Sequence, residues 1–148
     1  MGDARFSLYR LLQSFIRSWL TQDKALFLSL LHRDVHYSES HGPVYVGRAA
    51  CERWFAEWNA RGKVLEWTID EYCEDANAGT LSFEWTFRCL YDGAVAGFRG
   101  ASFMTVSGGE IVGVREYRTA DERTYPCNPE LGPDGLPLAD DGISGAEE

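Results

Sequence analysis

The chain has 148 residues, a formal net charge of −9 and 45% hydrophobic residues, which predicts one globular domain with a hydrophobic core. A surface this acidic repels phosphate backbones and anionic membranes, so we expect neither nucleic acid nor a membrane as a partner. The sequence has no signal-like N-terminus and no apolar stretch long enough to span a bilayer, and we expect a cytoplasmic protein with reduced thiols.

The first part of the chain predicts three helices and one short strand. Apolar side chains recur at helical spacing in residues 5–20 and again in residues 24–31. Residues 35–39 alternate apolar and polar side chains, as a strand does, and His41-Gly42-Pro43 predicts a turn after it. Residues 48–61 predict a third helix with an aromatic face, which the following glycine ends.

The second part predicts strands that share one apolar face. Apolar and polar side chains alternate through residues 63–73, where Leu65, Trp67 and Ile69 are expected on the inward apolar face, and again through residues 80–91. Asp92-Gly93 predicts a tight hairpin. Two further strands are expected at residues 95–106 and 110–118. The three helices are what the chain offers to cover the apolar face. The predicted fold class is therefore α+β, with a curved antiparallel sheet wrapped around three helices in the order ααβαββββ.

The end of the chain differs in composition from the rest. Residues 126–148 contain four of the five prolines, together with several glycines and many acidic residues. Little apolar periodicity is present there, so the segment is expected to be a loosely held acidic tail. The predicted domain accordingly covers residues 1–125.

Several short sequence motifs resemble those of the nuclear transport factor 2-like superfamily. Tyr37–Gly42 (Y-S-E-S-H-G), followed by the aromatic helix, is similar to its first strand and third helix, and Phe98–Gly100 and Val114–Tyr117 (V-R-E-Y) are similar to its last two strands. Over about residues 5–120 the pattern resembles SnoaL-like polyketide cyclases, ketosteroid isomerases and limonene epoxide hydrolases. The resemblance implies a cone-shaped fold and a homodimer, in a superfamily that includes enzymes, binding proteins and interaction modules.

The resemblance also implies two catalytic candidates. The isomerases carry their general base three residues before a glycine, and Glu39 stands three residues before Gly42. The epoxide hydrolases carry a catalytic aspartate in a W-R-D-Y word, and Glu116 occupies that place here. The epoxide hydrolases also use an Arg and a second Asp, and at those places this chain has Trp85 and Phe87 or nearby residues. Of the isomerases' oxyanion partners, only the tyrosine has a candidate here, Tyr9. The resemblance therefore does not imply either complete mechanism.

Strand alternation supports the same two glutamates independently. Glu39 shares a strand face with Val35 and Tyr37, and Glu116 shares one with Val112 and Val114. A carboxylate buried among aromatic rings loses hydration, which raises its pKa toward the range that suits a general acid or base. In the alternative interpretation Glu39 faces water at a strand end.

For Glu116 the alternative is a structural ion pair with Arg99 or Arg115. His41, beside the turn, is expected to transfer protons or else to be an ordinary surface residue. Tyr37 is expected to donate a hydrogen bond to a ligand, or else to be a core tyrosine. The residues expected to contact a ligand, or in the alternative to form ordinary core, are Trp54, Trp58, Trp67, Trp85, Phe87 and Arg99.

The sequence thus predicts a protein that binds a small apolar molecule. The first hypothesis is cofactor-independent acid–base catalysis on a carbonyl-bearing substrate, of isomerase, cyclase or hydrolase type. The four cysteines include no C-x-x-C pair and the three histidines show no known ligand spacing, so neither a metal nor a cofactor is expected. The second hypothesis is a non-catalytic ligand-binding or dimeric interaction module. A third possibility is a scaffold whose cavity is filled by its own aromatic side chains, which predicts no pocket of useful volume.

Overall fold

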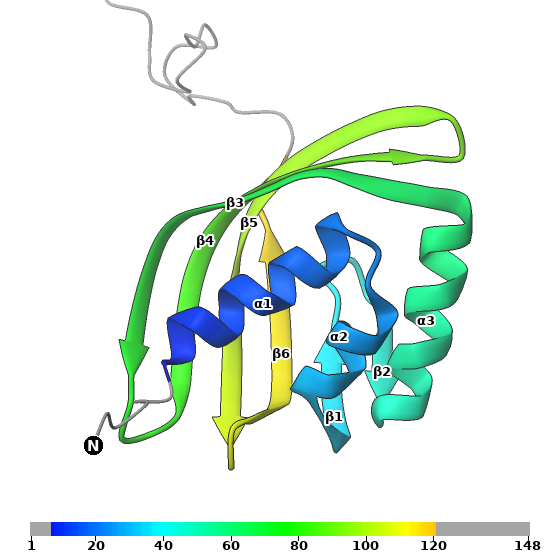
Figure 1. Ribbon diagram of the computed structural model, residues 1–148. Coiled ribbons are helices and arrows are strands. Elements are labelled where there is room, and N and C mark those ends of the chain that lie inside the picture. The colour runs from blue at the N-terminus through cyan, green and yellow to red at the C-terminus, as the bar shows by residue number, and fades with distance from the viewer. Residues whose placement is uncertain (1–6, 121–148) are drawn as a thin grey trace, which may run out of the picture.

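A computed structural model describes residues 7–120, which form three helices and one six-stranded sheet (Figure 1). In chain order the elements are α1 (Leu8–Leu20), α2 (Lys24–Leu30), β1 (Leu31–Ser38), β2 (Val44–Val46), α3 (Arg48–Arg61), β3 (Gly62–Asp75), β4 (Thr80–Tyr91), β5 (Ala94–Ser107) and β6 (Glu110–Arg118). The predicted tail, residues 126–148, lies outside the described residues. None of the helices within residues 7–120 is long and apolar enough to cross a membrane.

The helices α1 and α2 begin where a side chain accepts a hydrogen bond from one of their first free N–H groups. The Ser7 hydroxyl accepts a hydrogen bond from the Arg10 N–H at 3.3 Å, and α1 starts directly after it. Asp23 does the same for α2 through the Leu26 N–H at 3.0 Å. The buried face of α1 is continuous and points into the sheet; it consists of Leu8, Leu11, Leu12, Phe15, Ile16, Ser18 and Trp19.

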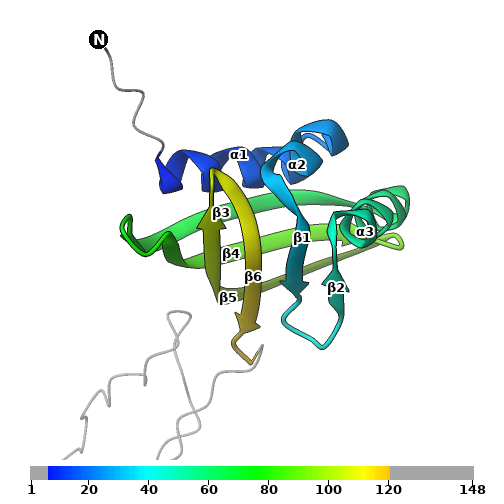
Figure 2. The ribbon, with the colours of Figure 1, turned by 90° about the horizontal axis from the view of Figure 1, so that it is seen from below.

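The sheet is curved, unclosed and mixed, with the strand order β2-β1-β6-β5-β4-β3 (Figures 1 and 2). The predicted all-antiparallel sheet is wrong at one pair, because β1 and β6 run parallel, with Tyr37 opposite Val114 and Ser38 opposite Arg115. Turn signals report only on strands that are neighbours in sequence, and these two are far apart in the chain. The strand β2, which pairs antiparallel with β1, is an addition to the predicted order.

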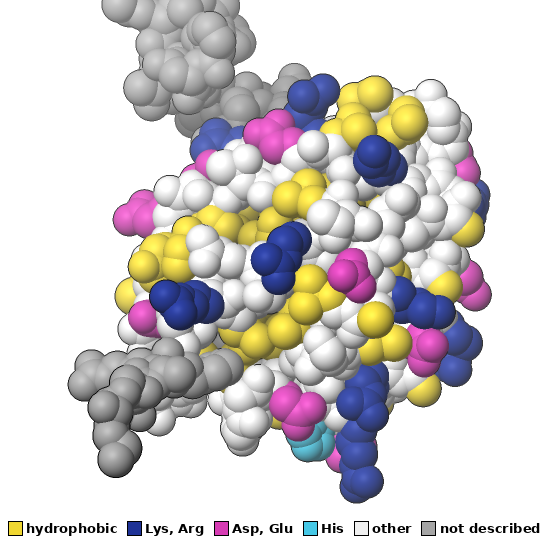
Figure 3. Space-filling view, viewed as in Figure 1, with side chains coloured by type: hydrophobic (Ala, Val, Ile, Leu, Met, Phe, Trp, Pro, Cys, Tyr) yellow, Lys and Arg dark blue, Asp and Glu magenta, His cyan; other side chains and the backbone are white. Residues whose placement is uncertain are grey.

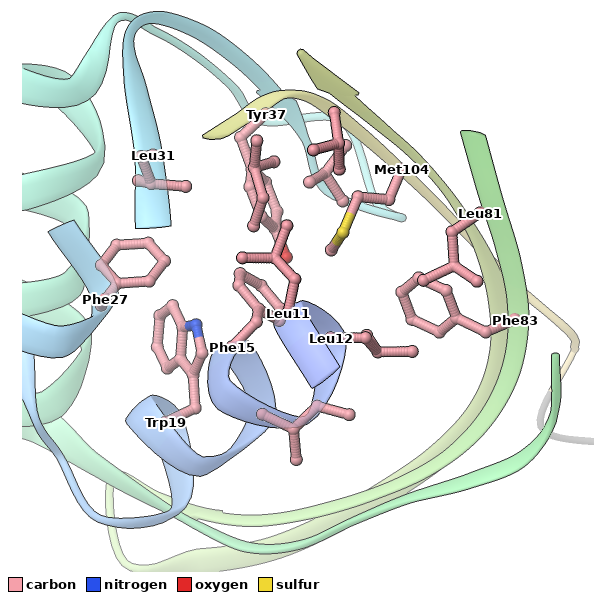
Figure 4. Packing of buried hydrophobic residues seen from close by; sticks show 14 of the residues in the cluster. Leu11, Leu12, Phe15, Trp19, Phe27, Leu31, Tyr37, Leu81, Phe83 and Met104 are labelled. Atoms are coloured by element: carbon pink, nitrogen blue, oxygen red, sulfur yellow. The ribbon is translucent and has the colours of Figure 1, made fainter. Parts of the chain in front are cut away.

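The core lies between α1 and the concave face of the sheet. Leu12 of α1 points toward Phe83 on β4, and Phe15 of α1 points toward Tyr37 on β1 (Figure 4). On β3 the predicted inward position of Leu65 is wrong, since its side chain is 44% exposed while the preceding valine is buried. A register shift between residues 64 and 66 reverses the alternation there, as a β-bulge does.

One glycine allows a close contact inside the sheet. Gly100 on β5 pairs with Trp85 on β4, and a Cβ atom at this glycine would lie 2.6 Å from the Trp85 ring. The indole of Trp85 therefore packs against bare backbone, and its N–H donates to Ser102 Oγ at 2.8 Å. At the surface, hydrophobic side chains are visible between charged ones on the face shown in Figure 3.

Candidate acid–base site

The parallel pairing of β1 and β6 brings the carboxyl ends of both strands to the same edge of the fold. Ser38 ends β1 opposite Arg115, and continuing that register by one residue places Glu39 beside Glu116. In an antiparallel pair the two carboxyl ends would lie at opposite edges. Tyr37 stands opposite Val114, and Glu116 follows Val114 by two residues on the same strand. Side chains two residues apart in a strand share a face, so Tyr37 and Glu116 face the core on the same side. The sheet topology thus gathers Tyr37, Glu39 and Glu116.

Glu116 is held in the interior by a single tyrosine. The Tyr37 hydroxyl, which is fully buried, donates to Glu116 Oε2 at 2.9 Å. Burial raises the pKa of Glu116 to about 8; the hydrogen bond from Tyr37 opposes this rise, and the charge of Glu39 adds to it. Burial and the charge of Glu116 also raise the pKa of Tyr37 well above its usual value. At neutral pH the pair is therefore a neutral tyrosine bonded to a mostly protonated acid.

Glu39 lies in a tight turn directly after β1. Its N–H donates to the carbonyl of Pro43 at 2.9 Å, and only 10% of its side chain is exposed. Burial raises the pKa of Glu39 to about 7, against the polar contacts of Trp54 and Tyr45, which lower it. His41 Nε2 lies 3.2 Å from Glu39 Oε2, and 54% of the His41 side chain is exposed. The turn thus links a half-ionised carboxylate to the surface.

Aromatic rings from α3 and β2 surround this carboxylate. The Trp54 ring lies 4.7 Å from that of Tyr37 and stacks on Tyr45 at 4.4 Å with an angle of 13°. Sequence reasoning missed Tyr45. The alternation in Val44-Tyr45-Val46 directly after the predicted turn was the available signal, although three residues are few for a strand assignment.

Three of the predicted ligand residues form a separate aromatic group on β3 and β4. Trp67, Trp85 and Phe87 meet edge to face, with ring centroids 5.4 to 6.5 Å apart. Phe15 of α1 connects this group to the carboxylates, since its ring lies 5.6 Å from Trp67 and 6.2 Å from Tyr37. The two groups therefore form one continuous series of packed rings on the concave side of the sheet, called the aromatic lining below, with the carboxylates at one end.

The structure does not bring the remaining candidates to the carboxylates. Trp58 packs against Trp19 and Tyr91, at 5.7 and 5.5 Å. Tyr9 stacks on Tyr72 at 4.3 Å.

The side chain of Arg99 is exposed, in contrast to the buried Ser102 and Met104 of the same strand, so the expectation that it contacts a ligand is at odds with its outward position. Within residues 7–120 no arginine forms an ion pair with Glu116, which removes the structural ion pair considered above for the described part of the chain.

The sequence matches one family model over most of its length. The model of the family described as SnoaL-like domain matches residues 12–114, which is most of the chain and includes Tyr37 and Glu39. The chain belongs to the SnoaL-like family. This confirms the resemblance found in the sequence, and the match ends two residues before Glu116. A search of curated proteins found no match.

Solved structures share the fold of this SnoaL-like domain. An LEH-like epoxide hydrolase of M. tuberculosis has a TM-score of 0.69 at 17% identity, covering 76% of this chain and 82% of that one. The Delta 5-3-ketosteroid isomerase from a Mycobacterium species has a TM-score of 0.66 at 18% identity, with coverage of 74% and 91%. A computationally designed 17-OHP binder has a TM-score of 0.69 at 21% identity, with coverage of 77% and 94%. At these identities the likeness concerns the fold alone.

The chemistry available to the SnoaL-like domain follows from its donor set. Within the described part of the chain, no three His, Cys, Asp or Glu side chains come together as metal ligands. The groups that do meet are two carboxyl groups with pKa values raised toward neutrality and the phenols and indole that bond to them. Such a set can accept a proton at one oxygen and donate one at another.

Proposed function

We propose that this SnoaL-like protein is a cofactor-independent acid–base enzyme that binds a small apolar, carbonyl-bearing molecule. The observation that supports the proposal most is the pair of adjacent glutamates, whose pKa values are raised to about 7 and about 8 by burial. Catalytic carboxyl groups require a pKa near the working pH. Structural carboxylates have no such requirement, because they are usually ionised and paired.

The two glutamates receive different roles from their surroundings. Glu39 has the lower pKa and lies 3.2 Å from the exposed His41, so it serves as the base that removes a proton from the carbon next to the substrate carbonyl. Glu116 has the higher pKa and is mostly protonated, so it donates a hydrogen bond or proton to the carbonyl oxygen as the electron pair moves there. The product of this step is an enol, which the proton on Glu39 can convert to an isomer or which can attack a second carbonyl.

Two neighbouring groups complete the proposed cycle. Tyr37 fixes the orientation of Glu116 through its 2.9 Å hydrogen bond, which leaves the other carboxyl oxygen for the substrate. His41 stands 3.2 Å from Glu39 at the surface and exchanges the abstracted proton with solvent.

The aromatic lining supports an apolar ligand. Trp54 and Phe87 are half-buried and offer ring surface to a ligand, whereas Trp67 and Trp85 are buried and support them from the core. Rings of this kind bury flat apolar molecules well. The structural neighbours include a ketosteroid isomerase and a 17-OHP binder, which supports a carbonyl-bearing polycyclic molecule as the first class to test. The homodimer and the cytoplasmic location stay predictions.

The alternative function is ligand binding without catalysis. One observation favours it: Tyr37, which bonds to Glu116, is fully buried in the hydrophobic core, as a purely structural tyrosine would be. A binding protein needs the aromatic lining but has no use for glutamates that titrate near neutrality, and this difference separates the two hypotheses.

The test is proton exchange, which needs no knowledge of the final product. The protein is incubated in D2O with a panel of cyclic ketones and 3-oxo-steroids, and deuterium entry at the carbon next to the carbonyl is followed by NMR. The wild type is expected to accelerate exchange for at least one compound, and Glu39→Gln to reduce the rate by about 100- to 10,000-fold. Glu84→Gln, an exposed acid on the outer face of β4, is the matched control with an unchanged rate.

Tight binding of a panel compound without any exchange, in the wild type as in Glu39→Gln, would contradict catalysis and favour the binding module. Glu116→Gln separates the acid role, because glutamine still donates a hydrogen bond but cannot supply a proton. We expect exchange to persist there at a reduced rate, while Glu116→Leu abolishes it.

A further inference from the structure

The short strand β2 directs one side chain toward the carboxylates. Val44 and Val46 are 56% and 61% exposed, whereas Tyr45 between them is half-buried. Tyr45 stands directly opposite Tyr37 in the antiparallel β1–β2 pair, so the two phenols lie on the same face of the sheet. The single inward position of this edge strand is thus occupied by a hydrogen-bond donor beside the proposed base.

Tyr45 is held in place by the helix that follows it. Its ring stacks on Trp54 of α3 at 4.4 Å and 13°, and the other contacts of Trp54 are to core rings, with Tyr37 at 4.7 Å and Trp19 at 4.9 Å. Trp19 is 3% exposed, so Trp54 rests on a rigid surface. The position of the Tyr45 hydroxyl is therefore set by packing that continues into the core.

Both members of this stack act on the same carboxylate. The indole of Trp54 and the hydroxyl of Tyr45 each make a polar contact that lowers the pKa of Glu39. In return, burial and the charge of Glu39 raise the pKa of Tyr45 to about 12, so its hydroxyl stays a donor at physiological pH. Glu116, by comparison, has one donor, Tyr37. The backbone places Tyr45 near Glu39 independently, because the Glu39 N–H bonds to the Pro43 carbonyl and Tyr45 stands opposite Tyr37, so Glu39 and Tyr45 are diagonal neighbours across the two chain segments.

We propose that Tyr45 is a positioning residue: stacked on Trp54, it orients the Glu39 carboxylate and keeps it available to accept a proton. The role in catalysis rests on the acid–base function proposed above. The role in holding Glu39 does not, because it concerns contacts that exist without substrate.

The other charged and titratable groups around this stack come from four elements. His41 lies in the same turn as Glu39, Tyr37 comes from β1 and Glu116 from β6. On α3, Cys51 and Glu57 both raise the pKa of Tyr45, which keeps its proton in place. Of these groups His41 is the one whose side chain is mostly exposed and lies 3.2 Å from Glu39, so a His41→Asn background separates its effect from that of Tyr45.

The test compares two matched tyrosine variants. Tyr45→Phe and Tyr37→Phe each keep a ring in its stack and remove one hydroxyl. The carboxylate titrations of Glu39 and Glu116 are measured by 13C NMR, together with the pH profile of proton exchange. Tyr45→Phe is expected to move the titration of Glu39, and with it the acidic limb of the profile, upward by about half a pH unit or more. Tyr37→Phe is expected to move Glu116 and the alkaline limb instead. Trp54→Phe, which keeps an aromatic ring but removes the indole N–H, is expected to shift Glu39 in the same direction as Tyr45→Phe.

The outcomes separate this inference from the proposed function. An unchanged Glu39 titration in Tyr45→Phe, both with the native histidine and in the His41→Asn background, overturns the positioning role even if the protein is an enzyme. A shifted Glu39 titration supports it. If Glu39 shifts but no variant or wild type exchanges protons with any compound, Tyr45 still positions Glu39 and it is the acid–base function that fails.

Discussion

The two ends of the aromatic lining are built from similar rings but differ in their polar atoms. At the carboxylate end, Tyr37, Tyr45 and Trp54 surround two glutamates, and their O–H and N–H groups act on the carboxyl oxygens. At the β3–β4 end, the rings meet edge to face, and the polar contacts are few. There the N–H of Trp85 donates to Ser102 at 2.8 Å, and the N–H of Trp67 is buried without a partner within residues 7–120.

The difference shows that burial has two separate consequences in one core. Around Glu39 and Glu116 it disfavours charge and raises the pKa values toward neutrality. Around Trp85 it removes apolar area from water and contributes to folding. Substitutions at the first end should therefore change chemistry and pH dependence, and those at the second end should change stability.

The largest expected effect on stability is at the second end. Trp85→Ala should lower the free energy of unfolding by about 3–5 kcal/mol, because the side chain is 2% exposed and its loss leaves a cavity. Glu39→Gln, at the first end, should change it by less than about 1 kcal/mol. Urea denaturation followed by far-UV circular dichroism measures both values. Equal losses for the two variants would contradict the division between the two ends.

The pH dependence of the free energy of unfolding should change with Glu116, at the carboxylate end. A carboxyl group whose folded pKa is about 8 binds more protons folded than unfolded between its ordinary value near 4.5 and about 8. Its contribution to the free energy of unfolding therefore falls as the pH rises through that range, by on the order of 2–4 kcal/mol.

Glu116→Gln should remove most of this fall, and Glu84→Gln, on the exposed face, should leave it in place. Denaturation curves collected from pH 5 to pH 8 provide the comparison. The same slope in wild type and Glu116→Gln would show that this carboxyl group titrates normally.

A smaller effect on stability is expected from the buried hydrogen bond between Trp85 and Ser102, at the β3–β4 end. Ser102→Ala removes the acceptor of the Trp85 N–H and should reduce stability by about 1–3 kcal/mol. A double-mutant cycle with Trp85→Phe should show coupling between Ser102 and Trp85. The matched cycle with Trp67→Phe should be close to additive, since no hydrogen bond joins Trp67 to Ser102.

The smallest effect is expected at the surface of the first end. His41 is 54% exposed, and an exposed ion pair contributes about 0.2–1 kcal/mol. His41→Asn should thus leave stability nearly unchanged and reduce proton exchange by several-fold, because Glu39 then returns its proton to water directly. A loss of stability as large as that of Trp85→Ala would mean that His41 has a structural role.

Most elements of the fold could be predicted from local patterns. The third helix at residues 48–61 and the strand at residues 80–91 have the predicted bounds, because their periodic signals are long and end at glycines or turn residues. The inward position of Leu65 was wrong because a bulge reverses alternation without changing composition. The parallel pair of β1 and β6 could not be predicted, because strands distant in sequence leave no local signal of their pairing.

The candidate site was predictable in part. Strand alternation placed Tyr37, Glu39 and Glu116 on inward faces, and the structure brings these three together. Their proximity depends on the parallel pair, which the sequence did not indicate. Tyr45 was missed because three residues of alternation are too few to distinguish a strand from a turn.

The most direct test of the account is the titration of Glu39 and Glu116 in the wild type, by 13C NMR of their carboxyl carbons. We expect both carboxyl groups to titrate well above 4.5, with Glu39 near 7 and Glu116 near 8, and Glu39→Gln to lower the pKa of Glu116 by removing a neighbouring charge. If both glutamates titrate near 4.5 and Glu39→Gln leaves the pKa of Glu116 unchanged, the proposed acid–base pair is contradicted, because neither carboxyl group would then be buried or coupled to the other.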